Sequence, residues 1–257
     1  MKIGLFIKQG AIDETTTNDL IHKLVSLGFE YDNKTPEYVF TIGGDGTFLK
    51  AVHTYFSQLS KITFIPANKG KLGYFSDFAL EEFRNILSNL ASEEYVTNSY
   101  SLLKGEFNDE VVYGVNEIRL ENAFKTLTAK VYVNGEYLET FRGNGLLVAT
   151  SKGSSAYNKS LSGAVIDSAL EVMQLTEIAP INNRLYESIH SSLVLPKDSE
   201  IVFKGDFTSS YIGNDHLVKT DANFDELKIT LSDIKVNILS KKDRSFIYKL
   251  NDAFIGK

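Results

Sequence analysis

The chain of 257 residues contains no cysteine. This absence excludes a disulfide framework, a thiolate metal site and a cysteine nucleophile, and it fits a reducing compartment. Long apolar runs are also missing. The first apolar run, residues 3–7, ends at Lys8 and is far too short for the core of a signal peptide or for a membrane span. We therefore expect a cytoplasmic protein with no membrane partner.

Positive charge is scarce as well. The sequence has 27 Lys and Arg residues against 33 Asp and Glu, which gives a formal net charge of -6. A general nucleic-acid binder draws its affinity from basic surface, so this balance argues against nucleic acid as a partner. A small anionic ligand needs only local positive potential. No long charge block, low-complexity tract, proline-rich linker or internal repeat divides the chain.

The first part of the chain alternates between strand and helix patterns. Leu20, Leu24 and Leu27, for example, recur at helical spacing. Such alternation is typical of an α/β domain with a parallel sheet, which we assign to residues 1–97. The expected strands are residues 2–7, 38–42 and 62–65, and the expected helices are residues 15–27, 47–56 and 80–90.

After about residue 98 the pattern changes to short β-rich runs, which predict a β-rich domain over residues 98–235. Asn134-Gly135 between two such runs predicts a type I′ hairpin. One helix is expected at residues 163–175. The segment 236–257 is expected to pack back on the N-terminal domain, with a helix at residues 245–254. The expected strands include residues 111–115, 129–133 and 146–149.

The strongest local signal is Gly-Gly-Asp-Gly-Thr at residues 43–47, between an expected strand and an expected helix. Glycines there let the backbone turn tightly and bring N–H groups close to a phosphate, and a helix N-terminus favours negative charge. We therefore expect Gly43, Gly44, Gly46 and Thr47 to bind phosphate. Asp45 would repel that phosphate unless it binds a metal ion or accepts a proton from an attacking hydroxyl, and both roles suit a kinase.

In isolation the same motif has a simpler interpretation, in which Asp45 caps the helix and the glycines form a turn. It is not a Walker loop, because no Gly-Lys-Ser/Thr follows, and its spacing does not match the dinucleotide fingerprint of alternating glycines. Three other clusters carry groups that suit the binding of a nucleotide. Each also has a simpler interpretation, as an ordinary polar turn or a solvent-facing pair. These clusters are residues 116–117, 142–145 and 150–160.

Together these segments resemble the NAD kinase family across nearly the whole chain. The glycine-aspartate motif is shared with diacylglycerol and sphingosine kinases and, more distantly, with phosphofructokinases, so it indicates only a superfamily. The later motifs specify NAD kinase. The matching segments are residues 43–47, 70–74, 116–117, 141–145, 150–160 and 175–183.

The resemblance implies an α/β N-terminal domain and a β-rich C-terminal domain, as in NAD kinases and diacylglycerol kinases, with NAD bound between them in a homo-oligomer, usually a dimer or a tetramer. It implies transfer of the terminal phosphoryl group of ATP or polyphosphate to the 2′-hydroxyl of the adenosine ribose. Mg²⁺ or another divalent cation would come with the donor, without a dedicated protein metal site. Asp45 would be the general base. The NAD-binding residues would be Asp45, Gly46, Tyr74, Asn116, Glu117, Arg142, Asn144, Ser155, Ala156, Tyr157, Asn158, Lys159, Ser160, Ala179, Tyr186 and His216.

The sequence departs from the family pattern near the predicted nicotinamide end and in the Ser/Ala/Tyr loop. The family usually has aspartate where this chain has Asn144, and the loss of a negative charge there bears on the balance between NAD and NADH. The loop begins Thr-Ser-Lys-Gly instead of Thr-Pro-Ser/Thr-Gly. Its Lys152 adds a cation near the predicted ligand, although a solvent-facing lysine is the default expectation.

Two other functions remain open at this stage. A lipid kinase can be built on the same glycine-aspartate motif, but it would need a membrane-facing apolar or basic surface. Alternatively, the chain is a dinucleotide-binding sensor that has lost catalysis. Asn144, where the family usually has aspartate, is the feature that leaves this hypothesis open.

Overall fold

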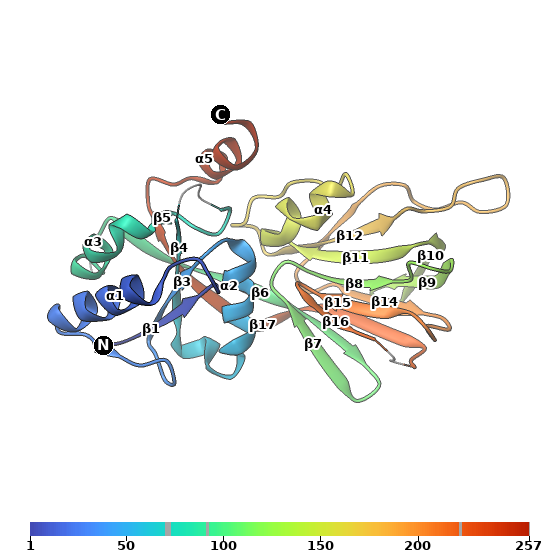
Figure 1. The fold of residues 1–257 in the computed structure, drawn as a ribbon. Helices are drawn as coiled ribbons and strands as arrows, with labels where there is room; N and C mark the ends of the chain where they lie inside the picture. Colours follow the sequence, from blue (N-terminus) through green and yellow to red (C-terminus); the bar gives the residue numbers. More distant parts are fainter. Residues whose placement is uncertain (70–72, 91–92, 221–222, 257) are drawn as a thin grey trace. The chain divides into compact units, whose positions relative to one another are not determined.

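The structure, a computed structural model, describes residues 1–69, 73–90, 93–220 and 223–256 (Figure 1). The chain divides into two units. The first, here called the α/β unit, comprises residues 1–100 and 234–257; the second, the β unit, comprises residues 101–233. The long strands β6 (Tyr95–Phe107) and β17 (Glu226–Lys241) cross the limits between the units. The functional domain limits expected from the sequence remain a prediction.

The α/β unit is built on a parallel sheet with strand order β17-β4-β3-β1-β2, and β5 pairs with the end of β4. The strands and helices expected in this part of the chain are present, with the last expected helix split into a short 3-10 turn and α3. In chain order the elements are β1 (Lys2–Ile7), α1 (Glu14–Ser26), β2 (Glu30–Tyr31), β3 (Tyr38–Ile42), α2 (Asp45–Thr54), a 3-10 helix (Phe56–Lys61), β4 (Thr63–Asn68), β5 (Phe78–Ala79), a 3-10 turn (Leu80–Glu82), α3 (Phe83–Ser88), α5 (Phe246–Leu250) and a π-helical turn (Asn251–Ile255).

Helices cover both faces of this sheet (Figure 1). On one face, Leu24 of α1 and Ile86 of α3 pack with Phe40 of β3 in a single apolar cluster. On the other face, Phe48 of α2 meets Phe64 of β4, with ring centroids 5.7 Å apart. Because both faces are buried, the central strands are apolar nearly throughout, as is usual for parallel sheets.

The β unit consists of two antiparallel sheets. The first has the order β10-β9-β14-β17 and includes the pair β6 and β7; the second has the order β13-β12-β11-β8-β15-β16. The predicted fold class, α/β followed by β-rich, is confirmed. The elements of this unit, besides parts of β6 and β17, are β7 (Glu110–Gly114), β8 (Glu117–Glu121), β9 (Leu127–Val133), β10 (Glu136–Gly143), β11 (Gly145–Thr150), a 3-10 turn (Lys152–Ser155), α4 (Tyr157–Ser160), β12 (Val172–Ile178), β13 (Leu193–Pro196), β14 (Glu200–Lys204), β15 (Tyr211–Asn214) and β16 (Leu217–Lys219).

The inward faces of the two sheets share one core. Val131 and Phe203 come from the first sheet, and Leu120, Val148 and Leu175 come from the second. Alternate residues of each strand point into this core, as the period of two requires. The alternation matters below, because Glu139 and Glu177 occupy inward positions on β10 and β12.

The predicted type I′ hairpin is confirmed between β9 and β10. Asn134 and Gly135 have φ values of 53° and 81°, and Val133 pairs with Glu136. Two consecutive positive φ angles define this turn, and its twist matches that of the strands it joins.

The helix expected at residues 163–175 is wrong, because β12 begins at Val172 and the preceding residues form turns and irregular backbone. Side chains bind several main-chain groups near the start of this segment. The Ala164 N–H donates to Gln174 Oε1 at 2.8 Å, and the Ile166 N–H donates to Ser154 Oγ at 2.9 Å. Apolar spacing alone could not reveal these buried partners.

Helix α5 is held to the α/β unit by an ion pair. Lys249 Nζ lies 2.9 Å from Oδ1 of Asp77, a side chain that is only 2% exposed. The other carboxylate oxygen accepts the Lys241 N–H at 3.2 Å. At the start of the helix, the Ser245 hydroxyl accepts the Tyr248 N–H and caps the first turn.

We expect Lys249→Met to lower the free energy of unfolding by about 3 kcal/mol, because it leaves a buried carboxylate without its cation. Lys50→Met, on the exposed surface of α2, removes a lysine of the same unit without breaking such a pair and should change stability by less than about 0.5 kcal/mol. Urea unfolding of both variants measures the difference. Equal stabilities would mean that the Asp77 to Lys249 pair contributes nothing to the fold.

Candidate functional site

The first group of candidate residues lies where β3 passes into α2. Gly43 has φ 149°, a conformation that residues with a side chain rarely adopt, and Gly44 caps the helix without a side-chain hydrogen bond. Because no described side chain makes a capping hydrogen bond at the start of α2, the N-terminus of the helix and the positive end of its dipole can interact with an anion. This geometry agrees with the phosphate-binding role expected for residues 43–47.

The Asp45 carboxylate is fixed by two backbone donors. The Tyr74 N–H donates to Oδ2 at 3.0 Å, and the Phe75 N–H donates to Oδ1 at 3.1 Å. Gly73 makes this approach possible, because a Cβ at that position would overlap the carboxylate. Of the expected segment 70–74, residues 70–72 lie outside the described residues, whereas Gly73 and Tyr74 contact Asp45 directly. The Tyr74 side chain itself is buried, with its ring centroid 6.4 Å from that of Phe254.

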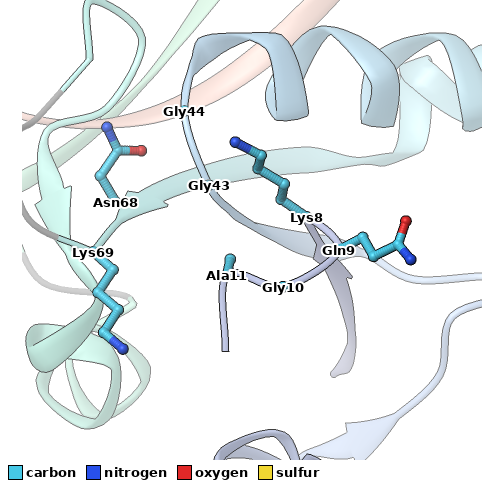
Figure 2. Close-up of a pocket in the computed structure, with 8 residues that line it drawn as sticks. All are labelled: Lys8, Gln9, Gly10, Ala11, Gly43, Gly44, Asn68 and Lys69. Atoms are coloured by element: carbon cyan, nitrogen blue, oxygen red, sulfur yellow. The ribbon is translucent and has the colours of Figure 1, made fainter. Parts of the chain in front are cut away.

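A cavity of about 410 Å³ opens beside this turn, at the carboxyl ends of β1, β3 and β4 (Figure 2). In sheets of this kind ligands bind beyond the carboxyl ends of the strands. Figure 2 shows the Lys8 side chain running toward Gly44, whereas Lys69 extends away from it. Among the residues described, those that line the cavity are Lys8, Gln9, Gly10, Ala11, Gly43, Gly44, Asn68 and Lys69.

Two lysines and no carboxylate appear among those lining residues, so the described wall of the cavity favours an anion. The sequence analysis missed Lys8 and Lys69. A usable signal existed for Lys8, because it directly follows the predicted strand 2–7, and parallel strands end at the same edge of the sheet. Lys69 follows β4, which ends at Asn68, three residues beyond the strand predicted at residues 62–65.

The second group of candidate residues lies in the β unit, where Asp215 shapes the chain before β8. Its carboxylate accepts the Val115 N–H at 2.9 Å and the Asn116 N–H at 2.7 Å. Asp215 precedes His216 in the turn between β15 and β16, so the expected residues Asn116, Glu117 and His216 come together here. His216 is exposed. The sequence analysis did not single out Asp215.

Glu117 is an unusual acid within this group. Its side chain is buried, and burial together with the nearby Asp215 raises its pKa to about 8, although the Arg119 guanidinium acts in the opposite direction from 3.3 Å. At neutral pH the carboxyl group is therefore largely protonated. Neither Glu117 Oε2 nor Asn116 Oδ1 has a hydrogen-bond partner among the described residues. Buried polar atoms are nearly always paired, so these two suit the polar groups of a ligand.

The loop 150–160 is attached to the same place. The Thr150 hydroxyl donates to the Val115 carbonyl at 2.8 Å and accepts the Gly153 N–H at 2.8 Å. Tyr157 is 36% exposed, with the Arg119 guanidinium 5.8 Å from its ring centroid. Its exposed ring remains able to contact a base. Ser155, Ala156, Lys159 and Ser160 follow the same loop, with Lys159 and Ser160 exposed.

Two loop residues differ from what their sequence suggested. The default expectation that Lys152 faces solvent is wrong, because the residue is only 3% exposed. Asn158 is fully buried, and its side chain donates to the Ser154 carbonyl and accepts the Thr176 hydroxyl proton at 2.7 Å. These contacts give Asn158 a role inside the loop, and direct binding of NAD by its side chain remains a prediction.

The remaining candidates gather at the opposite end of β11. Asn144 is exposed and donates from its side chain to the Asn122 carbonyl at 3.3 Å, and its N–H donates to the Ile178 carbonyl, next to Ala179. The Arg142 guanidinium stacks on the ring of Tyr186, 4.3 Å from its centroid. The six residues of β11 separate this group from the loop 150–160 by about 20 Å. Within one β unit, the expected site residues therefore form two groups rather than one.

No group of three or more His, Asp or Glu side chains that could hold a metal ion occurs among residues 1–69, 73–90, 93–220 and 223–256. In the same part of the chain, no helix is long and apolar enough to cross a membrane.

Comparison with known proteins identifies the family. The model described as ATP-NAD kinase N-terminal domain matches residues 16–95, and the one described as ATP-NAD kinase C-terminal domain matches residues 109–240. The NAD kinase of Latilactobacillus sakei is 35% identical over 263 residues, covering 100% of this chain and 98% of the relative. NAD kinase 1 of Bacillus anthracis is 31% identical, covering 100% and 99%.

Solved structures show the same fold. The structure of yeast NADH kinase complexed with NADH has a TM-score of 0.84 at 18% identity and covers 100% of this chain and 89% of that chain. The NAD kinase from Archaeoglobus fulgidus in complex with ATP has a TM-score of 0.79 at 20% identity, with 98% and 99% covered. The resemblance seen in the motifs is thus confirmed over the full length, and the chain belongs to the NAD kinase family of phosphotransferases.

Proposed function

We propose that this enzyme transfers the terminal phosphoryl group of ATP or polyphosphate to the 2′-hydroxyl of the adenosine ribose of NAD. The 2′-oxygen attacks the terminal phosphorus, and the bond from that phosphorus to the bridging oxygen breaks. The hydroxyl proton passes to Asp45, and the donor leaves one phosphate shorter. The products are NADP and, from ATP, ADP.

The observation that carries this proposal is the fixed carboxylate of Asp45 at the start of α2, directly after the open Gly43-Gly44 turn. The N–H groups of Tyr74 and Phe75 orient both oxygens, and each oxygen keeps a lone pair for a substrate proton. Orientation before the reaction removes much of the entropic cost of bringing base and hydroxyl together. The turn supports the phosphates while the carboxylate receives the proton.

The basic cavity supports a polyphosphate chain as the part of the donor that is recognised. Lys8 and Lys69 supply positive charge, and no aromatic side chain that would stack on a nucleotide base lies among its described lining residues. We therefore propose that the site recognises phosphates more than a base, so that ATP and inorganic polyphosphate both serve as donors.

The residues of this site fit a divalent cation that arrives with the donor. Each oxygen of Asp45 accepts one backbone N–H and keeps one lone pair, so a cation bound directly to the carboxylate would compete with the substrate proton for that lone pair. Phosphate oxygens would supply most of the coordination of Mg²⁺. When bound, the cation neutralises the donor phosphates and the charge that develops on them.

The acceptor is proposed to use the groups at both ends of β11. Asn116 and the largely protonated Glu117 offer hydrogen bonds to a ribose, and Tyr157 offers a ring. Arg142, Asn144, Ala179 and Tyr186 would contact the nicotinamide half. Because about 20 Å separates the two groups within one chain, we propose that a second subunit of a homo-oligomer, a dimer or tetramer, supplies the nicotinamide contacts.

The decisive measurement is NADP formation by purified protein given NAD, Mg²⁺ and either ATP or polyphosphate. Product from both donors supports the proposed donor recognition. Product from neither donor, together with tight NAD binding, would instead support a dinucleotide sensor. Vesicle binding with phosphorylation of diacylglycerol would support a lipid kinase.

We expect Asp45→Asn to reduce turnover by about a hundredfold or more while NAD affinity and melting temperature stay near those of the parent, because a positioned base typically contributes 10²–10⁴ in rate. Gly73→Ala is the matched variant, since it keeps the carboxylate but displaces it. It should also slow turnover. Steady-state kinetics and calorimetry measure both, and parental turnover in Asp45→Asn would remove the proton-transfer role.

Lys8→Met and Lys69→Met should each raise the KM for the donor by about threefold to tenfold, the effect of losing a charge contact worth about 1 kcal/mol. The KM for NAD should change little. Lys50→Met on the exposed surface of α2 serves as the charge control. If the KM for both ATP and polyphosphate stays at the parental value in the two cavity variants, the donor does not bind in this cavity.

Asn144→Asp should raise the preference for NAD over NADH by about threefold to tenfold, because a carboxylate attracts the cationic nicotinamide ring of NAD but not the neutral ring of NADH. Asn18→Asp, on the exposed face of α1, makes the same change in net charge elsewhere. Competition binding of the two cofactors to both variants gives the ratio. An unchanged ratio at position 144 would leave Asn144 as a turn residue bonded to Asn122.

A further inference from the structure

Two acids lie at inward positions of the β unit, one from each sheet. Glu139 on β10 is 8% exposed and shares the inward face with Phe141; Glu177 on β12 is 9% exposed and shares it with Leu175. Carboxyl groups at such positions cost free energy unless they are paired or protonated. Their presence in an otherwise apolar core therefore calls for a role.

Both acids bind the same short piece of backbone. The Ile189 N–H donates to Glu139 Oε2 at 2.9 Å, and the His190 N–H donates to Glu177 Oε2 at 3.1 Å. On each acid, Oε1 has no other hydrogen-bond partner among the described residues when both groups are ionised. The Glu177 side chain lies within hydrogen-bonding reach of Glu139, so the two carboxyl groups can interact with each other once one of them carries a proton. Burial first, then the charge of Glu177, raises the pKa of Glu139 to about 7.

The backbone that they hold belongs to residues 179–192, here called the strap, which connects β12 to β13. Near its start, the Ile181 N–H donates to the Arg142 carbonyl at 2.7 Å. Farther along, Tyr186 stacks under the Arg142 guanidinium. The acid pair binds the returning half, close to the Ser192 hydroxyl, which bonds with Thr176 at 2.8 Å. Both halves of the strap are therefore fastened to strands of the sandwich.

We propose that Glu139 and Glu177 are positioning residues that share one proton, and that this shared proton holds the strap against the sandwich. With the proton in place, one carboxyl donates to the other and each accepts one strap N–H. Without it, two adjacent negative charges repel in a buried setting, and the strap is released. The consequence for NAD rests on the proposed function, because the strap carries Ala179 and Tyr186.

On the strands β9 to β13 and the strap, all of whose residues are described, no charged side chain besides the two acids is buried. Strands β11, β12 and β13 carry no charged residue besides Glu177. The strap's own charged residues are exposed, and Arg142 is engaged by Tyr186. On β9, the alternation that buries Val131 turns Lys130 to the outer face. The charged or titratable residues on these surrounding elements are Lys130, Tyr132, Glu136, Tyr137, Arg142, Arg184, Tyr186, Glu187 and His190.

The direction of the pH dependence follows from the raised pKa of Glu139. In the unfolded chain the group loses its proton near its ordinary value of 4.5, whereas in the folded protein it keeps the proton to about pH 7. The stabilisation is therefore fully present below about pH 4.5 and is lost as the pH rises through about 7. We expect the strap to be closed at pH 6 and loosened at pH 8.5.

The test uses Glu139→Gln in the full-length protein. The glutamine carbonyl still accepts the Ile189 N–H, and its NH₂ group donates to Glu177 at every pH. The contact between residues 139 and 177 therefore no longer needs a shared proton. Hydrogen exchange reports on the strap directly. After correction for intrinsic exchange, protection of the Ile189 and His190 amides should fall about tenfold in the parent between pH 6 and 8.5, and less than about twofold in Glu139→Gln.

Glu187→Gln is the matched control, because it makes the same chemical change at an exposed acid of the strap and should leave the pH response of the strap as in the parent. Glu177→Gln repeats the test from β12 should Glu139→Gln fold poorly. Protection in the parent that does not change with pH would overturn the proposal, as would an equal pH response in Glu139→Gln and the parent. Because exchange needs no substrate, either result stands apart from the outcome of the NADP assay.

If the enzyme makes NADP as proposed, the KM for NAD should rise about fivefold more between pH 6 and 8.5 in the parent and in Glu187→Gln than in Glu139→Gln, because any titration of Glu117 is common to all three proteins. A merely structural role of Glu139 would lower stability without removing this pH dependence. If hydrogen exchange follows the prediction but the KM for NAD does not, the shared proton holds the strap and the strap lies away from NAD.

Discussion

The proposed chemistry of the α/β unit depends on one interaction, in which the Asp45 carboxylate accepts two backbone N–H groups. Tyr74 and Phe75 belong to the segment after β4, whereas Asp45 begins α2 after β3. Their hydrogen bonds therefore join two neighbouring strand ends at the edge where ligands of parallel sheets bind. Gly73 is required at this junction, because any side chain there would occupy the space of the carboxylate.

Carboxyl groups that accept backbone N–H groups also occur in the β unit. Asp215 accepts N–H groups from the chain before β8, and Glu139 and Glu177 accept N–H groups from the strap. In each case an acidic side chain satisfies donors of an irregular segment that carries proposed ligand residues. Several acids of this acidic chain are thus internal structural groups, which reconciles a net charge of -6 with a cavity whose described charged lining residues are lysines.

The two buried acids of raised pKa have different surroundings. Glu117 lies beside Arg119, and its Oε2 has no hydrogen-bond partner among the described residues, so its proton is suited to a ligand. Glu139 faces another carboxyl group, so its proton is suited to holding the chain together. Burial is the first cause of both shifts, but the neighbour decides what the retained proton does.

The sequence by itself determined the family, the order of α/β and β-rich parts, the hairpin at Asn134-Gly135 and the position of Asp45 between strand and helix. These features depend on local conformation: two positive φ angles, helical spacing, and glycines ahead of a helix. The same local rules predicted a helix at residues 163–175, which failed because the buried side chains of Ser154 and Gln174 bind its backbone.

Only the tertiary structure decided the burial of Lys152 and Asn158, the cavity between Lys8 and Lys69, and the meeting of Glu139 with Glu177. The two acids are separated by 38 positions and come from different sheets, and Asp215 meets Asn116 across 99 positions. Such contacts arise from the packing of two sheets and the ends of neighbouring strands, which no local pattern encodes. Burial and partners then set the protonation of each acid, and a side chain's type alone does not reveal them.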